Sequence, residues 1–135
     1  MSTILDFLKS VAGICRTSPL KPDLWELHGN RVIIRLHDVP ELRLPGDAVY
    51  LEGKGLRNPI LVVRKDDGEY LSVANRCTHF GRKLDPVPGE PLLRCCSVGR
   101  STFDHDGNRL GGPAGKPLEV YRVELTNGEL LIDLQ

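Results

Sequence analysis

A thiol and an imidazole stand two positions apart in the segment CTHFGRKL, residues 77–84. Side chains at positions i and i+2 of an extended segment point to the same side, so Cys77 and His79 can reach one inorganic centre. Two further thiols, Cys95 and Cys96, follow after intervals of 15 and 16 residues. Thiolates and imidazoles bind both iron–sulfur clusters and zinc, so the residue types alone leave both kinds of site open.

These two segments resemble the ligand loops of the Rieske-type ferredoxins, which have the forms C-x-H-x-G-x-x-L and C-P-x-H-G-x-x-F. The resemblance extends strand by strand over roughly residues 42–134, and GGPA, residues 111–114, is similar to the proline-containing third loop that covers the cluster. It implies a [2Fe-2S] cluster in which two cysteines bind one iron and two histidines bind the other. It also implies cofactor contacts from Ser101, as a hydrogen-bond donor toward the cluster sulfurs, and from Pro113 in the third loop.

The chain departs from the family at the second histidine. Gly99 stands three residues past Cys96, and Val98 stands three residues past Cys95, so neither register supplies an imidazole. We prefer Cys96 as the ligand because it keeps Phe103 in register with the family without an insertion, whereas Cys95 requires one extra residue. The resemblance therefore implies that the outer iron has lost one of its two imidazoles.

Three candidates for the vacant position remain open. Cys95 is the best, because thiolates bind iron–sulfur clusters, but neighbouring residues on a strand point to opposite faces, and both cysteines can bind only if the chain turns there. His105 is the second, although FDHDG is typical of a strand running into a hairpin, which would carry it toward solvent. The third is an exogenous thiol, water or anion. A simpler interpretation has one thiol of the pair Cys95 and Cys96 pointing into the core.

The missing imidazole has a consequence for the redox potential. A thiolate in its place adds negative charge and disfavours the extra electron, so we expect a potential below that of a standard Rieske centre. Phe103 acts in the same direction, because high-potential members of the family carry at this position a tyrosine that donates a hydrogen bond to a cysteine sulfur.

Short β-type segments separated by Gly, Pro, Asn and Asp turns run from residue 23 to the end of the chain, which predicts an all-β fold. The resemblance specifies a Rieske-type antiparallel β-sandwich base with a cluster-binding lobe inserted at about residues 75–116. We predict a Rieske-like domain over residues 42–134. Residues 1–41 form an extension of a helix and a strand segment in this interpretation.

The N-terminal helix is predicted from apolar residues at helical spacing, which indicate a short amphipathic helix. Those residues are Ile4, Phe7, Leu8, Val11 and Cys15. Charged residues interrupt the apolar run, so we do not expect an export signal. Cys15 is then expected to be a core thiol.

The composition of the chain limits the kinds of partner that we expect. The chain of 135 residues has 18 basic and 18 acidic residues and a pI near 6.9, so no electrostatic footprint for nucleic acid stands out. No apolar run is long enough for a membrane span. The four cysteines are not spaced like a secreted disulfide framework, which favours metal or thiol chemistry in the reducing cytoplasm. Arg82 and Lys83 stand in the first loop, where quinol-reacting Rieske proteins carry an extra cysteine, so no loop-to-loop disulfide is expected.

The leading hypothesis is a soluble one-electron carrier, a Rieske-type ferredoxin that passes electrons between a reductase and an oxygenase or other redox enzyme. Its expected partner is therefore a redox protein, either a reductase or an oxygenase component. Nothing in the chain suggests a nucleophile with its base, so we do not expect a stand-alone enzyme. Two alternatives remain. In the first, the scaffold has lost its cluster and serves as a binding module or subunit. In the second, a single zinc ion is held by Cys77, His79 and one or both of Cys95 and Cys96.

Overall fold

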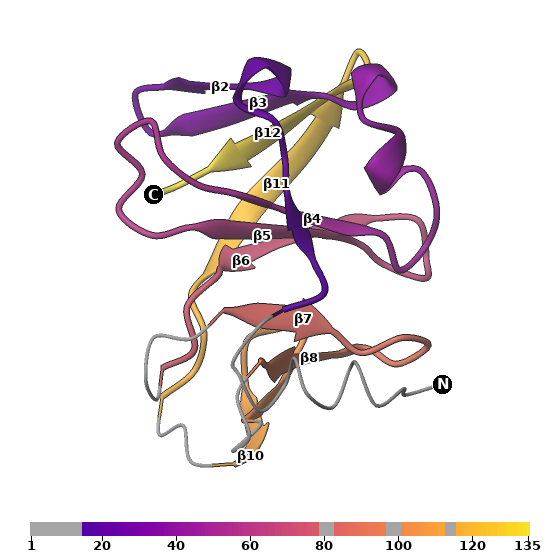
Figure 1. Ribbon diagram of the computed structural model, residues 1–135, viewed down its shortest axis with the longest axis vertical. Coiled ribbons are helices and arrows are strands. Elements are labelled where there is room, and N and C mark those ends of the chain that lie inside the picture. The colour runs from indigo at the N-terminus through magenta and orange to yellow at the C-terminus, as the bar shows by residue number, and fades with distance from the viewer. Residues whose placement is uncertain (1–14, 79–82, 97–100, 113–115) are drawn as a thin grey trace.

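The computed structural model describes residues 15–78, 83–96, 101–112 and 116–135, which form two β-sheets (Figure 1). The all-β prediction is confirmed. The helices within these ranges are three short 3-10 turns, Pro22–Leu24, Leu36–Asp38 and Pro40–Leu42. The predicted amphipathic helix lies almost wholly in residues 1–14, outside the described ranges, so the structure gives it no support. Within the described ranges no helix has the length and apolarity needed to cross a membrane.

Eight strands form the larger sheet in the order β1-β4-β5-β6-β11-β12-β3-β2. Their bounds are β1 Ser18–Pro19, β2 Trp25–His28, β3 Arg31–Arg35, β4 Ala48–Leu51, β5 Ile60–Arg64, β6 Tyr70–Ala74, β11 Val120–Thr126 and β12 Glu129–Asp133. All neighbours are antiparallel except β1 and β4, which are parallel. The start of β11 pairs with β6 and the rest pairs with β12, so this strand joins the two halves of the sheet.

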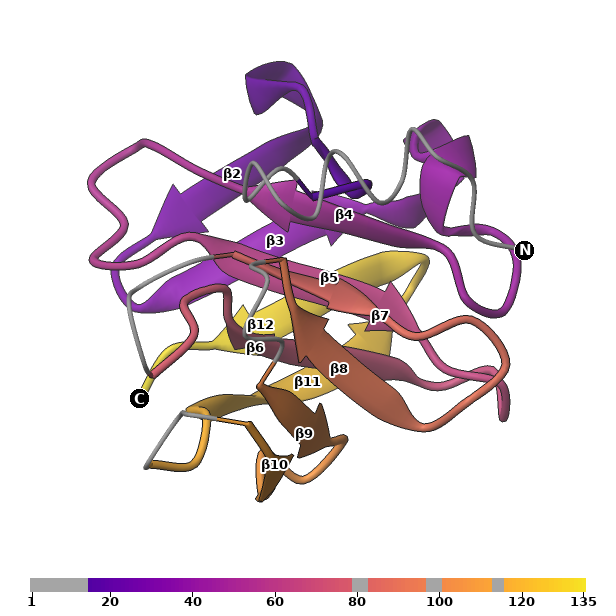
Figure 2. The same ribbon diagram turned by 60° about the horizontal axis from the view of Figure 1, so that its bottom comes forward.

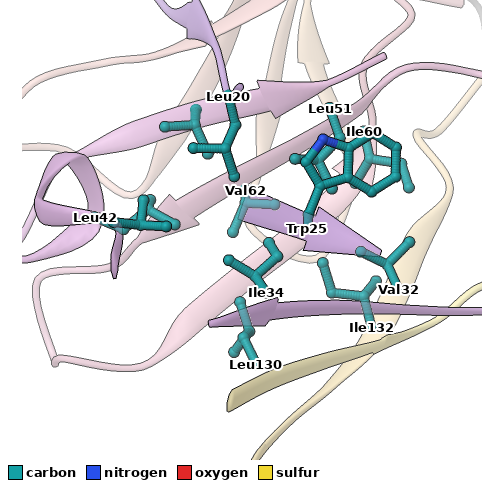
Figure 3. Packing of buried hydrophobic residues seen from close by; sticks show 12 residues of the cluster. Leu20, Trp25, Val32, Ile34, Leu42, Leu51, Ile60, Val62, Leu130 and Ile132 are labelled. Carbon is teal, nitrogen blue, oxygen red and sulfur yellow. The ribbon is translucent and has the colours of Figure 1, made fainter. Parts of the chain in front are cut away.

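The main core lies between those two halves, which curl to face each other (Figure 3). On β3 and β12 buried and partly exposed residues alternate, as expected for strands with one face in the core. The facing residues in register are Val32 with Ile132 and Ile34 with Leu130, and all four are fully buried. Trp25 of β2 pairs with Ile34 and packs in the same cluster, which secures the N-terminal strands on the sheet.

The predicted boundary between residues 41 and 42 remains a prediction. The sheet itself runs across it, because β3 lies on one side of this boundary in sequence and β4 on the other. β3 is an interior strand paired with both β2 and β12. The residues that were expected to form an extension therefore contribute strands to the larger sheet.

A four-stranded sheet occupies the segment between β6 and β11, where the inserted lobe was predicted, in the order β10-β9-β8-β7. Its strands are β7 Leu84–Pro86, β8 Leu92–Cys95, β9 Thr102–Asp104 and β10 Arg109–Gly111. Figure 2 shows strands β7 and β8 of this sheet in front of β5 and β6. A second core cluster joins the two sheets, with Leu61 and Val73 from the larger one and Leu84, Leu93 and Phe103 from the smaller one. The position of the smaller sheet is thus fixed by apolar packing.

The packing of the main core predicts different effects for two substitutions on neighbouring strands. Ile132→Ala removes a fully buried side chain between the two sheet halves and should lower the free energy of unfolding by about 2 to 5 kcal/mol. Leu125→Ala on β11, where the side chain is 58% exposed, should change it by no more than about 0.5 kcal/mol. Urea unfolding under reducing conditions measures both; equal effects would contradict the described packing.

Candidate metal centre

The first cysteine-bearing segment leaves β6 at Asn75, which is buried and makes hydrogen bonds through both its backbone and its side chain. The Asn75 backbone N–H donates to the carbonyl of Pro59 (2.7 Å), and its Oδ1 accepts from the N–H of Leu84 (2.8 Å). Cys77 lies between these anchors and is 1% exposed. His79, its predicted partner as a ligand, falls outside the described residues, so its role stays a prediction.

The second segment begins at the end of β8, where Cys95 and Cys96 are both buried. The N–H of Cys95 donates to the carbonyl of Ser101 (2.9 Å), which closes this loop at its base. The N–H of Cys96 donates to the carbonyl of Lys83 (3.0 Å), which attaches it to the end of the first loop. The two loops that were predicted to share a site therefore meet at their stems.

The two neighbouring cysteines of this segment have different surroundings. Cys95 lies two residues after Leu93, on the same face of β8, and belongs with it to the second core cluster, which also contains Cys77. Cys96 lies outside that cluster. This arrangement is the one expected if one thiol of the pair packs in the core.

The third loop is joined to the other two at both of its ends. Gly112 lies so close to Ser101 that a Cβ atom at Gly112 would be 2.4 Å from the Ser101 Cα. On the other side, the Thr78 hydroxyl donates to the carbonyl of Lys116 (2.6 Å). Pro113, the predicted covering residue, falls outside the described residues. Ser101 is 1% exposed at this three-loop junction.

A disulfide bond joins Cys15 to Cys96, with the two Cα atoms 5.3 Å apart. The expectation that Cys15 is a core thiol is therefore wrong: its side chain is half-buried and covalently bonded. The cysteine spacing, which favoured metal or thiol chemistry over a disulfide framework, did not anticipate this bond. The sulfur of Cys96, our preferred second-loop ligand, is not a thiolate in this state.

Asp85 on β7 holds the segment that follows Cys15. Its carboxylate accepts hydrogen bonds from the backbone N–H of Arg16 (2.8 Å), from the N–H of Thr17 (3.0 Å) and from the Thr17 hydroxyl (2.6 Å). The ligand atoms of Cys15, Asp85 and Cys96 all lie within 4.8 Å of one another. Among the described residues this is the group of three donors that the fold brings together.

Sequence reasoning missed Cys15 and Asp85 at this position. Cys15 contacts Cys96, which is 81 residues away in the chain, and Asp85 contacts Thr17, which is 68 residues away. No local sequence pattern signals contacts over such separations. The only available signal was the even number of cysteines, which permits pairing without naming the partners.

His105, the second candidate for the vacant position, lies in the β9–β10 turn and is half-buried. Burial lowers its pKa below the usual 6.5, and the positive charge of Lys65 acts in the same direction, while Asp66 opposes it. Lys65 and Asp66 belong to the β5–β6 turn. The histidine is therefore placed beside that turn and not with the gathered donors of Cys15, Asp85 and Cys96.

The residues present suit a thiolate-bound iron cluster in part. Cys77 and Cys96 offer sulfur donors from two loops tied together at their stems, and the glycine of the third loop allows a close backbone approach. Cys96 meets the requirement only as a reduced thiol, because a disulfide sulfur carries no thiolate charge. Reduction of the Cys15–Cys96 bond is thus a condition for this fit.

Comparison with known proteins identifies the domain. Residues 33–122 match the family described as the Rieske [2Fe-2S] domain. Among curated proteins, the cytochrome b6-f complex iron-sulfur subunit 2 of Trichormus variabilis is 24% identical over 99 residues, 66% of this chain and 55% of that protein. The same subunit of Nostoc sp. matches equally. The chain spans about half the length of these curated relatives.

Solved structures agree on the fold. The cyanobacterial plasma membrane Rieske protein from Synechocystis PCC 6803 superposes with a TM-score of 0.52 at 25% identity, over 62% of this chain and 85% of that one. The ferredoxin of carbazole 1,9a-dioxygenase from Nocardioides aromaticivorans IC177 gives a TM-score of 0.61 at 19% identity, over 76% and 95%. A chain in a complex of reduced oxygenase and oxidized ferredoxin of carbazole 1,9a-dioxygenase gives 0.61 at 18%, over 83% and 94%.

The junction of the second and third loops predicts different effects for two neighbouring glycines. Gly112→Ala should destabilise the protein by about 1 to 3 kcal/mol, because the new methyl group would meet the Ser101 backbone and Gly112 has a φ of +87°. Gly111→Ala should have little effect, since nothing lies within 4 Å of the added carbon. Thermal unfolding of both variants provides the comparison; a harmless Gly112→Ala would show that the two loops are not in contact.

The surroundings of His105 predict a pH dependence. The pKa of His105 is lower in the folded protein than in the unfolded chain, so below pH 6.5 the unfolded chain binds a proton more readily. The free energy of unfolding should therefore decrease as the pH falls below 6.5. An NMR titration should give His105 a pKa below 6.5. Lys65→Met should raise that pKa and Asp67→Asn should lower it further. A pKa at or above 6.5 in the unmodified protein would refute the described burial.

Proposed function

The chain belongs to the Rieske [2Fe-2S] domain family, and we propose that it is an electron carrier of the ferredoxin type. The observation that carries this proposal is the family match, which spans both cysteine-bearing loops and the third loop. Electron transfer is the common role of this domain, and a bound cluster accepts and returns one electron. The contacts among the three loop stems support the proposal, because they hold donors from separate segments in one place.

We propose that the ligand set includes Cys77 and His79 from the first loop and Cys96 from the second. The lack of the second imidazole, at Gly99, is part of this proposal. Cys95 is assigned to packing because it is still part of β8, on the same buried face as Leu93, whereas Cys96 follows the end of the strand. The protein's own contribution is to fix the donors through their loop stems and to exclude water from the buried thiols, which tunes the potential.

Ser101 and Pro113 are proposed as cofactor contacts rather than iron ligands. Ser101 is buried at the base of the second loop, one of the positions from which a hydroxyl can donate toward cluster sulfurs. Such hydrogen bonds stabilise the added electron and raise the potential. Pro113 would cover the cluster from the third loop, whose ends are held by Gly112 and Lys116.

We propose a redox protein as the partner, either a reductase or an oxygenase component, and a carrier role rather than stand-alone catalysis. A neighbour in fold is the ferredoxin of a dioxygenase, and another is found in a complex of oxygenase and ferredoxin. A carrier needs a site near its surface for a partner, not a substrate pocket. Cytoplasmic location remains a prediction from cysteine usage.

One observation favours a second candidate. The Cys15–Cys96 disulfide makes the sulfur of Cys96, a proposed ligand, unavailable to iron. This is expected for a domain that keeps the scaffold without the cluster and acts as a binding module or subunit. A zinc ion on the same loops is the other alternative from the sequence. Anaerobic purification followed by visible spectroscopy and by iron, sulfide and zinc analysis separates all three. Colour with two irons per chain supports the carrier, zinc without colour supports the zinc site, and a folded metal-free protein supports the module.

Substitution of the loop residues should distinguish ligands from packing residues. Cys77→Ser, His79→Ala and Cys96→Ser should each reduce iron content by about tenfold or more, because each removes a donor. Cys95→Ala should leave iron content and the visible spectrum unchanged while lowering stability, because it only shortens a buried side chain. Iron retention in both Cys77→Ser and Cys96→Ser would reject the ligand set, and iron loss in Cys95→Ala would assign the second-loop ligand to Cys95.

A further inference from the structure

We propose that Cys15 is a cluster ligand, and that its thiolate takes the place of the imidazole that the second loop lacks. The inference rests on the proposed function and goes beyond it by naming the residue that completes the site. The cluster would then be held by Cys15, Cys77, His79 and Cys96, three thiolates and one imidazole. Cys15 lies outside the match to the family, which begins at residue 33.

The position of Cys15 is the first support for this assignment. Its sulfur is brought into bonding contact with that of Cys96, the proposed second-loop ligand. With Cα atoms 5.3 Å apart, both side chains reach the same small volume. A donor that touches a cluster ligand is at the edge of the cluster site. Among the described residues, no other thiol meets Cys96 in this way.

The backbone around Cys15 is held independently of the disulfide. Asp85 accepts three hydrogen bonds from Arg16 and Thr17, the two residues that follow Cys15. Further along, β1 pairs in parallel with β4, and the N–H of Leu20 donates to the carbonyl of Tyr50 (2.8 Å). Figure 1 shows this segment running from β4 to β7. Asp85 is therefore a positioning residue that aims Cys15 at the loop junction.

The sulfurs of Cys15 and Cys96 become negatively charged only when they bind a metal. After reduction they are neutral thiols beside the Asp85 carboxylate, and the three ligand atoms lie within 4.8 Å of one another. Further negative charge in this partly buried place is unfavourable unless a bound cation offsets it. The two states of the site are then the disulfide without iron and the two thiolates on the iron cluster, with the neutral thiols between them.

Conversion between the two states is a balanced thiol–disulfide exchange. A dithiol reductant donates two electrons and two protons to the Cys15–Cys96 bond and becomes a disulfide, leaving two thiols. Each thiol then loses its proton as its sulfur binds iron. The sulfur of Cys96 cannot be in the disulfide and on iron at once, so the disulfide belongs to the cluster-free protein.

The competing thiol, Cys95, is placed differently. Sequence reasoning favoured it for the vacant position, but its side chain lies on the same buried face of β8 as Leu93. Using it together with Cys96 would require neighbouring residues to turn toward the same side. Cys15 meets Cys96 without such a distortion.

Thiol counting in the cluster-loaded protein tests the proposal without any substitution. The full chain, purified anaerobically with its cluster, is denatured in excess alkylating agent and weighed by mass spectrometry. All four cysteines should be alkylated if Cys15 and Cys96 were both bound to iron as thiolates. Two alkylations, with Cys15 still linked to Cys96 in a peptide map, would show a disulfide beside the cluster and overturn the proposal.

Substitutions then ask whether Cys15 touches the cluster. Cys15→Ser should change the EPR g-values and make loss of iron to a chelator about tenfold faster or more. Cys15→His, which offers an imidazole instead, should retain the cluster and raise its potential, because a neutral ligand favours the extra electron. Cys95→Ser is the matched control and should leave the EPR spectrum unchanged. An unaltered spectrum and iron retention in Cys15→Ser would contradict the assignment.

The two proposals fail in different ways. If the unmodified protein binds no iron after anaerobic purification and reconstitution with a dithiol, the proposed function and the role of Cys15 are both rejected. If it binds two irons but two alkylations are found, or if Cys15→Ser behaves as the control does, the carrier stands and only the role of Cys15 is rejected.

Discussion

The backbone at the start of β7 holds the candidate site together, since both cysteine-bearing loops are attached to it. Lys83 accepts a hydrogen bond from Cys96, and Leu84 donates one to Asn75. Leu84 is also fully buried in the second core cluster, so this junction is anchored by packing as well as by hydrogen bonds. Donors carried by separate segments are thus held in place by the loop stems, which limits how far the loops can move apart.

The junction in turn depends on β5, which is buried on both faces. Ile60 and Val62 face the main core, whereas Leu61 and Val63 face the cluster shared with the smaller sheet. A strand that serves two cores is apolar throughout, as the run ILVV is. The smaller sheet is held against β5 because Leu61 and Val63 pack in the same cluster as Leu84.

Much of the fold was predictable because its signals are local. Short apolar runs rich in β-branched residues and leucine, such as RVIIR and ELLID, with glycine-containing turns between the strands, indicate an all-β fold without tertiary information. The place of the smaller sheet followed from the two loop motifs and their interval. The parallel pairing of β1 with β4 did not, because two residues carry no periodicity. Contacts of Cys15 and Asp85 across the chain likewise leave no local pattern.

The segment from Cys15 to Thr17 is attached near the smaller sheet by the disulfide to Cys96 and by hydrogen bonds to Asp85. A reductant breaks only the disulfide. In the chain-entropy description, a disulfide across 81 residues stabilises the fold by about 4 to 5 kcal/mol. Reduction removes that contribution but leaves the three hydrogen bonds to Asp85 and the pairing of β1. Cys15 therefore stays beside Cys96 as a thiol, where it can re-form the bond or bind whatever Cys96 binds. A covalent link between two otherwise unattached segments would not have this property, because its reduction would release them.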